Sequence, residues 1–404
     1  MRLRGITSIN GNNQPLFIID GVYVNNAEIP SGLRFASGAN RGNEENSGNR
    51  LADLDPNDIE RVEVLKGAAA SVIYGQRASA GVVVITTKRG KYGKAKVSLP
   101  GGCAIGTRPV DIHLNALSSL GVKYKIVQGY VHATAPKGLI GNKIRFPKIS
   151  VGATENLIIA ASFAKGTTDL SNCAIEPEIK DLVNFLKKMG CNIKWVGKRS
   201  IKIEGVTEVK ETSYSVMFDR IEAGTYLVAA AVTEGNLNIK NIIPKIIQTE
   251  INTLKKIGAK IKVTKDEIHI IGNKKVKSMN IKTAPYPGFP TDLQAQMMVL
   301  LCKANKQSII KEDIFENRFM HVAELNRMGA KISTNGNKAK VSGNINFEAA
   351  ELMATDLRAS VSLILAALTT KGKSVINRIY HLDRGYENIE KKLKKVGAKI
   401  RRVN

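Results

Sequence analysis

The sequence predicts an α/β fold built from repeated units over residues 99–404. Five segments combine an amphipathic helical pattern, a glycine and a basic-apolar strand, and their glycines recur every 68 to 71 residues, at Gly121, Gly190, Gly258, Gly329 and Gly397. A second, more apolar helical pattern alternates with them and ends near Gly166, Gly235, Asn305 and Gly372. Glycine and asparagine suit the left-handed residue that closes a helix. We therefore expect a repeat of about 69 residues.

In chain order, each unit contains an apolar helix, a strand, a surface helix and further strands. The apolar helices are predicted within residues 155–166, 224–235, 292–305 and 356–372, and the surface helices with their following strands within 114–127, 182–195, 251–263, 322–334 and 389–403. We expect the apolar helices to be buried and the lysine-rich helices to lie outside. The first unit lacks a preceding apolar helix, so the repeat is truncated on its N-terminal side.

Length and charge restrict the possible functions. The chain has 404 residues, 43% of them hydrophobic, which is enough for two or three domains with buried cores. Its formal net charge is +26, of which residues 99–404 carry +22. Aromatic residues make up only 5% and do not alternate with the basic ones, so the sequence does not favour a nucleic-acid partner. A small anionic substrate is the better explanation.

The cysteines and the apolar segments indicate the compartment. Cys103, Cys173, Cys191 and Cys302 form no CxxC pair, so we expect neither a zinc site nor a redox dithiol, and no metal or cofactor. Isolated cysteines are typical of a reducing, cytoplasmic protein. No signal-peptide pattern begins the sequence and no run of 18 apolar residues occurs, so no membrane insertion is expected.

Residues 1–98 have a different character from the rest. LFIIDGVYV and GVVVITTKRG indicate strands, and Asp55 to Asp58 indicate a helix start before IERVEVL. The motifs RGITSINGNNQPLFIIDGV and LDPNDIERVEVLKGAAASVIYGQRASAGVVVITTKRGK resemble the plug domain of SusC/RagA-type TonB-dependent receptors, over residues 2–96. The barrel strands that such receptors require do not follow. We predict three domains: a small α+β plug-like segment at 1–98, then 99–217 and 218–404.

Several residues of the repeated region suggest chemistry, each with a simpler alternative. Cys103 follows Pro-Gly-Gly on a loop near Arg108, where a cation favours the thiolate, although an isolated cysteine is more often inert and buried. Asp292 begins a predicted helix after APYPGFP, where Thr291 or Asp292 is an N-cap and Asp292 can also act as a base in a cleft. Arg318, Arg358 and Arg384 lie near helix starts and are either surface ion-pair partners or an anion site.

The motifs VSLPGGCAIGTRPVDIHL, FPKISVGATENLIIAA, APYPGFPTDLQAQ, IFENRFMH, MATDLRAS and YHLDRGYENIEKKL make residues 97–404 resemble the enolpyruvyl transferases, specifically those that act on UDP-N-acetylglucosamine. The resemblance implies repeated βαβαββ units in a two-domain inside-out α/β barrel, here N-terminally truncated. It also implies transfer of the enolpyruvyl group of phosphoenolpyruvate to the sugar 3′-hydroxyl, in peptidoglycan precursor synthesis, without a metal.

The same resemblance implies roles for individual residues. Cys103 would protonate the methylene carbon of phosphoenolpyruvate, and Asp292 would take the proton of the sugar hydroxyl. The nucleotide sugar would be bound by Asp292 and by Arg108, Pro109, Val110, Asp111, Ile112, Lys148, Ile149, Ser150, Val151 and Ile314. Phosphoenolpyruvate would be bound by Arg108, Asp356, Arg358 and Arg384.

The sequence departs from this family at its N-terminal side. A GAKNA-type motif, whose lysine helps to bind phosphoenolpyruvate, is absent, and the plug-like segment stands in its place. We therefore expect a chimeric chain, joined near Lys96 to Leu99, with impaired activity. Two alternatives remain: an enzyme of the 5-enolpyruvylshikimate 3-phosphate synthase kind, and a fragment of an outer-membrane nutrient receptor.

Overall fold

The computed structural model describes residues 16–19, 22–24, 59–65, 82–87, 93–99 and 110–403. The chain divides into two compact units, residues 1–94 and residues 95–404, and each is described by itself. Within the described residues, no helix combines the length and the apolar character that a membrane crossing requires.

The smaller unit contains a four-stranded mixed sheet in the order β2-β1-β4-β3. Its strands are β1 (Leu16–Ile19), β2 (Val22–Val24), β3 (Ile59–Leu65) and β4 (Val82–Thr87). The predicted strands at LFIIDGVYV and GVVVITT are confirmed, and their Phe17, Ile18, Val82, Val83 and Ile85 side chains are buried.

The predicted helix at IERVEVL is wrong, because this segment is strand β3, paired antiparallel to β4. Its β-branched Val62 and Val64 stand opposite Ile85 and Val83 in the register. The cross-strand pairing of β-branched residues therefore outweighs the local helix-start signal of the preceding acidic residues.

The larger unit contains the repeated elements. Its first half consists of β5 (Lys94–Ser98), α3 (Asp111–Ser119), β6 (Lys123–Val127), β7 (Tyr130–Thr134), β8 (Lys143–Arg145), α4 (Val151–Ala161), β9 (Thr167–Ser171), α5 (Pro177–Lys188), β10 (Asn192–Gly197) and β11 (Ser200–Glu204). Its second half consists of α6 (Arg220–Val232), β12 (Asn236–Lys240), η3 (Pro244–Ile247), α7 (Gln248–Ile257), β13 (Lys260–Val263), β14 (Glu267–Ile271), β15 (Ile281–Lys282), η4 (Thr291–Leu293), α8 (Gln294–Cys302), β16 (Ser308–Lys311), α9 (His321–Arg327), β17 (Ile332–Asn335), β18 (Lys338–Val341), β19 (Glu351–Met353), α10 (Leu357–Ala367), β20 (Val375–Asn377), η5 (Ile379–Arg384) and α11 (Ile389–Lys395).

The glycines of the 69-residue pattern close the surface helices as predicted. All five lie just beyond α3, α5, α7, α9 and α11 and have positive φ angles, from 86° at Gly329 to 120° at Gly258. At Gly121, the glycine N–H donates to the Ser118 carbonyl and the next N–H donates to the Leu117 carbonyl. These two hydrogen bonds satisfy carbonyls at the helix end, which explains why glycine recurs at this position.

The predicted closure of the apolar helices is only partly correct. Gly166 and Gly372 have positive φ angles, but Gly235 and Asn305 do not have them. Directly before Gly235, the left-handed residue is Glu234 instead, with a φ of 56°. The apolar helices end several residues before the predicted positions, so the helix closures there do not depend on glycine.

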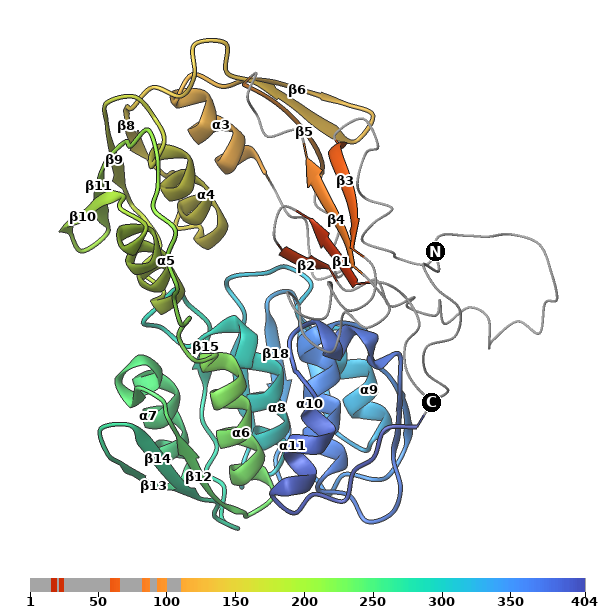
Figure 1. Ribbon diagram of the computed structural model, residues 1–404. Coiled ribbons are helices and arrows are strands. Elements are labelled where there is room, and N and C mark those ends of the chain that lie inside the picture. Colours follow the sequence, from red (N-terminus) through yellow and green to blue (C-terminus); the bar gives the residue numbers. More distant parts are fainter. Residues whose placement is uncertain are drawn as a thin grey trace. The chain divides into compact units, whose positions relative to one another are not determined.

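The apolar helices form the centre of the second half. α6, α8 and α10 lie side by side (Figure 1), and all nine residues of α8 are buried. The strands cover them with one face only, as the alternating burial of β14 and β18 shows. The lysines of α7 point away from the core at the helix end, while Ile251, Leu254 and Ile257 are buried. Helices inside and sheets outside are the predicted α/β arrangement.

Two sheets show the complete repeat. In the orders β10-β11-β9-β8 and β15-β16-β18-β17, a hairpin lies on one side and a parallel strand on the other. Among the described residues, the sheet β12-β14-β13 has three strands and lacks the parallel partner, and β19-β20 lacks the hairpin. The described part of the chain thus contains complete and incomplete copies of one unit.

Candidate active site

Asp292 lies in the 3₁₀ turn η4, directly before α8. Neither Thr291 nor Asp292 makes a side-chain cap to the helix, so the N-cap alternative for Asp292 is wrong. Its repeat counterpart Asp356 does cap, because its carboxylate accepts hydrogen bonds from the Arg358 and Ala359 N–H groups at 2.9 and 3.0 Å. The Asp292 carboxylate is therefore available for other partners.

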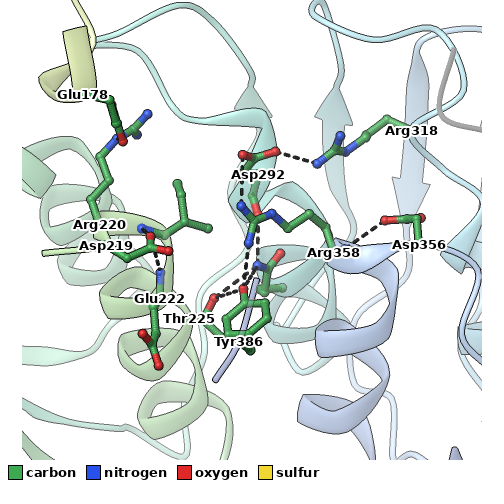
Figure 2. Close-up of polar contacts among 12 residues, drawn as sticks. Glu178, Asp219, Arg220, Glu222, Thr225, Asp292, Arg318, Asp356, Arg358 and Tyr386 are labelled. Carbon is green, nitrogen blue, oxygen red and sulfur yellow. Dashed lines mark hydrogen bonds and ion pairs between the residues drawn. The ribbon is translucent and has the colours of Figure 1, made fainter. Parts of the chain in front are cut away.

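Two arginines hold the Asp292 carboxylate between them (Figure 2). Arg318, which lies in the turn before α9, donates to Oδ1 over 2.7 Å. Arg358, which lies in the first turn of α10, donates to Oδ2 over 3.2 Å. The arginine side chains are 5% and 14% exposed, whereas that of Asp292 is 37% exposed. The surface ion-pair alternative is thus wrong for these two arginines, which are largely buried beside a partly open carboxylate.

The arginines keep Asp292 ionised at neutral pH. Burial raises the pKa of Asp292, but the Arg358 and Arg318 guanidinium groups lower it more, and the pKa lies below its ordinary value. Burial lowers the pKa of Arg358, but Asp292 and Tyr386 raise it above its ordinary value. In this arrangement Asp292 is a charged group but a weak base.

A buried polar network lies beneath the Asp292–Arg358 pair. Tyr386, only 1% exposed, accepts a hydrogen bond from Arg358 Nη1 at 3.2 Å and shares one with Thr225 Oγ1 at 2.8 Å. Gln296 Nε2 donates to the Asp292 carbonyl at 2.9 Å and to Thr225 Oγ1 at 3.2 Å. The network ties α6, α8 and the chain after η5 to the ion pair, and the low mobility of such buried networks favours a fixed geometry.

Sequence reasoning missed Tyr386, Thr225 and Gln296. A signal existed for Gln296, which, like Gln294, is a polar residue in a largely apolar helix and lies one turn after Asp292. Thr225 likewise interrupts an apolar helix. Nothing in the sequence joins Thr225 to Tyr386, which is 161 residues away.

His321 supports the arginine side of the site. It is 1% exposed at the start of α9, and it makes a hydrogen bond with the Arg318 backbone. Burial lowers the pKa of His321 to about 4, Asp356 partly opposes this effect, and Arg318 adds to it. His321 is therefore neutral at pH 7.

The predicted nucleotide-binding segments meet at the starts of two helices in the first half. Val110 precedes α3, which begins with Asp111, and Ser150 caps α4 by accepting from the Ala153 N–H at 3.3 Å. A Cβ on Gly152 would lie 3.1 Å from His113 Cε1, and His113 Nδ1 lies 2.7 Å from Asn156 Nδ2. The N-terminal ends of α3 and α4 are thus adjacent.

The exposure of these predicted residues varies. Asp111, Lys148 and Val151 are exposed, Val110, Ile149 and Ser150 are half-buried, and Ile112 is buried in the core. Ile314 is 39% exposed on the loop after β16, and Arg384 is exposed at the end of η5. Cys103, Arg108 and Pro109 lie outside the described residues.

The loop that leads to Asp292 is tied to the first half of the larger unit. Tyr286 donates its N–H to Glu176 Oε1 at 3.2 Å, and its carbonyl accepts from Arg199 Nη2 at 3.1 Å. Nearby, Arg220 donates to Glu178 Oε1 at 2.8 Å. These contacts connect the half that carries α3 and α4 to the half that carries Asp292.

The cysteines that the structure describes are unreactive. Cys173, Cys191 and Cys302 are buried and free. Burial raises the pKa of Cys173 and of Cys302 to about 12. The described residues contain no cluster of three or more potential metal ligands.

Comparisons with known proteins divide the chain between two families. The EPSP synthase (3-phosphoshikimate 1-carboxyvinyltransferase) family matches residues 65–393, and the TonB-dependent receptor plug domain matches residues 1–82. The two matches overlap over residues 65–82, upstream of the junction predicted near Lys96.

Curated relatives and solved structures refine this similarity. UDP-N-acetylglucosamine 1-carboxyvinyltransferase of Pelagibacter ubique is 77% identical over 337 residues, which are 83% of this chain and 80% of that protein. The protein of that name from Coxiella burnetii is 46% identical over 87% of this chain and 80% of its own length. The structure of the enolpyruvyl transferase NikO from Streptomyces tendae is similar with a TM-score of 0.70 and 26% identity, over 76% of this chain and 74% of that chain. EPSP synthase from Acinetobacter baumannii, at 19% identity and a TM-score of 0.58 over 76% and 74% of the chains, shares the fold.

Proposed function

Because the chain belongs to the enolpyruvyl transferase family, among the UDP-N-acetylglucosamine 1-carboxyvinyltransferases, we propose that it transfers the enolpyruvyl group of phosphoenolpyruvate to UDP-N-acetylglucosamine. The sugar 3′-oxygen bonds to C2 of phosphoenolpyruvate while C3 takes up a proton. Loss of a proton from C3 and cleavage of the bond between C2 and the phosphate oxygen then form the vinyl ether and release phosphate. This reaction is the first committed step of peptidoglycan precursor synthesis.

The observation that carries the proposal is the Asp292 carboxylate held by two arginines. A base must accept the proton of the 3′-hydroxyl, and Asp292 is an ionised, partly exposed carboxylate on a fixed scaffold. Its low pKa makes it a weak base while both arginines are paired to it. We propose that the anionic groups of phosphoenolpyruvate take over the Arg358 guanidinium, which raises the pKa of Asp292 when both substrates are bound.

The remaining predicted residues fit around this centre. Cys103 is the proposed acid toward C3, on a glycine-flanked loop suited to closing over substrate. Arg108 and Arg384 complete the anion site with Arg358. Asp356 caps the helix turn that carries Arg358, so we propose that Asp356 contributes to phosphoenolpyruvate binding by fixing the position of that arginine.

The adjacent starts of α3 and α4 are the proposed nucleotide site. Helix N-termini favour phosphate groups because their N–H groups and dipoles point toward the ligand. Val110 to Ile112 and Lys148 to Val151 lie at these ends. Arg108 and Pro109, which precede them in the sequence, and Ile314 from the second half are the further proposed contacts. We place the protein in the cytoplasm, where nucleotide sugars and free cysteines are both common.

We further propose that turnover is slower than in the relatives, because the GAKNA-type lysine is missing from this sequence and plug-like residues stand in its place. Loss of one electrostatic contact to the reacting group typically lowers kcat by about 10²-fold. On this proposal the chain is a chimera that keeps the base, acid and arginines of the enzyme.

The test is phosphate release by the purified full chain from phosphoenolpyruvate. We expect release only with UDP-N-acetylglucosamine, loss of release in Cys103→Ala, and a rate about 10²-fold below that of the Pelagibacter relative. Release that requires shikimate 3-phosphate instead would favour the synthase suggested by the family match at residues 65–393. Release with neither acceptor would refute the proposed reaction, and a rate equal to that of the relative would refute the impairment.

A further inference from the structure

Glu312 is a buried carboxylate directly after β16, with 2% of its surface exposed. Its Oε1 accepts from Thr283 Oγ1 at 2.9 Å and from the N–H groups of Ile314 and Phe315 at 2.8 and 3.2 Å. Its Oε2 accepts from Thr291 Oγ1 at 2.9 Å. The four donors are neutral and come from three separate segments, so the carboxylate joins these segments at one point.

Two of these segments lead directly to the candidate site. Thr291 directly precedes Asp292 in η4, a turn that has no side-chain cap of its own. The loop of Ile314 and Phe315 precedes Arg318, whose guanidinium lies 5.3 Å from the centre of the Phe315 ring. Glu312 therefore contacts the neighbours of both Asp292 and Arg318, which are paired at 2.7 Å.

We propose that Glu312 is a positioning residue, which holds the Asp292 and Arg318 side chains in the geometry of their ion pair by anchoring Thr291 and the Ile314–Phe315 loop. The proposal rests on the proposed function of Asp292 as the base. A buried carboxylate is costly to maintain, and its four hydrogen bonds offset that cost. Displacement of a catalytic group by about 1 Å can lower the rate roughly 100-fold, which gives such an anchor a large effect on catalysis.

The test uses substitutions that change one bond at a time in the full chain. Thr291→Val removes only the hydroxyl that reaches Oε2, and Glu312→Asp shortens the carboxylate by one methylene. We expect each to lower kcat by roughly 10- to 100-fold with little change in the KM for UDP-N-acetylglucosamine. Glu312→Gln keeps the three bonds to Oε1 and can donate to Thr291 Oγ1, so we expect kcat to recover to near the parent value.

The control separates positioning from stability. Thr253→Val removes a hydroxyl that donates to the Thr249 carbonyl at 2.8 Å within α7 and that makes no hydrogen bond to Thr291, Asp292 or Glu312. We expect no change in kcat and a smaller fall in the melting temperature than in Thr291→Val, because the acceptor is a neutral carbonyl and not a carboxylate. If Thr291→Val and Glu312→Asp behave like this control, Glu312 is only structural and the proposal is overturned.

A readout without turnover distinguishes this proposal from the proposed function. The titration of the Asp292 carboxyl, followed by carbon NMR in aspartate-labelled chain and assigned with Asp292→Asn, reports its pairing with Arg318. We expect the pKa of Asp292 to rise in Glu312→Asp and to stay unchanged in Thr253→Val. If the parent chain is inactive and the pKa of Asp292 still rises in Glu312→Asp, only the proposed function is contradicted. If the pKa of Asp292 is the same in Glu312→Asp as in the parent, the positioning role is contradicted.

Discussion

Replacement of Asp292 by asparagine tests the ion-paired carboxylate with almost no change of shape. Arg318 and Arg358 lose their shared counter-charge, and asparagine can accept from one guanidinium while its amide group opposes the other. A hydrogen bond to a charged group contributes about 1.5–3 kcal/mol, and solvent at the 37% exposed carboxylate weakens that contribution. We expect the free energy of unfolding to fall by about 2 kcal/mol, measured by urea titration.

The catalytic effect should be larger than the effect on stability. Asparagine cannot accept the proton of the 3′-hydroxyl, and general base catalysis typically contributes about 10²- to 10⁴-fold. We expect kcat for phosphate release to fall by that factor, with both substrates saturating. Glu267→Gln, which breaks the surface pair with Lys240 on the sheet β12-β14-β13, is the control and should leave kcat unchanged. A kcat within tenfold of the parent for Asp292→Asn would refute the reasoning.

Three further predictions concern the arginine, the histidine and the helix-closing glycines. Arg358→Lys cannot donate to two partners in the geometry of a guanidinium, so kcat/KM for phosphoenolpyruvate should fall roughly 10- to 100-fold in initial-rate assays, and an unchanged value would count against the anion site. Because the pKa of His321 is lowered to about 4, the folded state binds fewer protons than the unfolded state at any pH below about 6.5, the ordinary pKa of histidine. The contribution of neutral His321 to stability is therefore full above about pH 6.5 and falls by about 3 kcal/mol as the pH drops to about 4. Urea titrations across this range should show a shallower loss in His321→Gln, and equal slopes would contradict the buried neutral state. Gly258→Ala, with a φ of 120° and a Cβ position 3.0 Å from the Lys275 carbonyl, should cost more stability than Gly397→Ala, which has open space at a φ of 101°; equal melting temperatures would contradict this packing.

The sequence was informative where local chemistry repeats. Glycine closes each surface helix because the residue after the helix must be left-handed, and that requirement recurs at Gly121 and in every later unit. Where no such requirement exists, as at Asn305, the same reasoning was wrong. The β3 segment shows the other limit, since its conformation depends on pairing with β4 and not on its own helix signals.

The candidate site was predictable only in part, for a related reason. The positions of Asp292 and Arg358 near helix starts are visible in the sequence, but their pairing joins residues 66 positions apart. Tyr386, Thr225 and Glu312 come to the site through tertiary contacts that no local pattern encodes. Asp292 and Asp356 occupy equivalent repeat positions, yet only Asp356 caps its helix while Asp292 pairs with two arginines, so the same sequence pattern gives different side-chain contacts.

The most direct test of the proposed reaction is detection of its product. The purified full chain is incubated with phosphoenolpyruvate and UDP-N-acetylglucosamine until phosphate release stops, and the nucleotide fraction is analysed by proton NMR and mass spectrometry. We predict two vinyl proton signals and the mass of an enolpyruvyl ether of the nucleotide sugar, both absent with Cys103→Ala. Unchanged UDP-N-acetylglucosamine after prolonged incubation, under conditions in which the Pelagibacter relative converts it completely, would contradict the account.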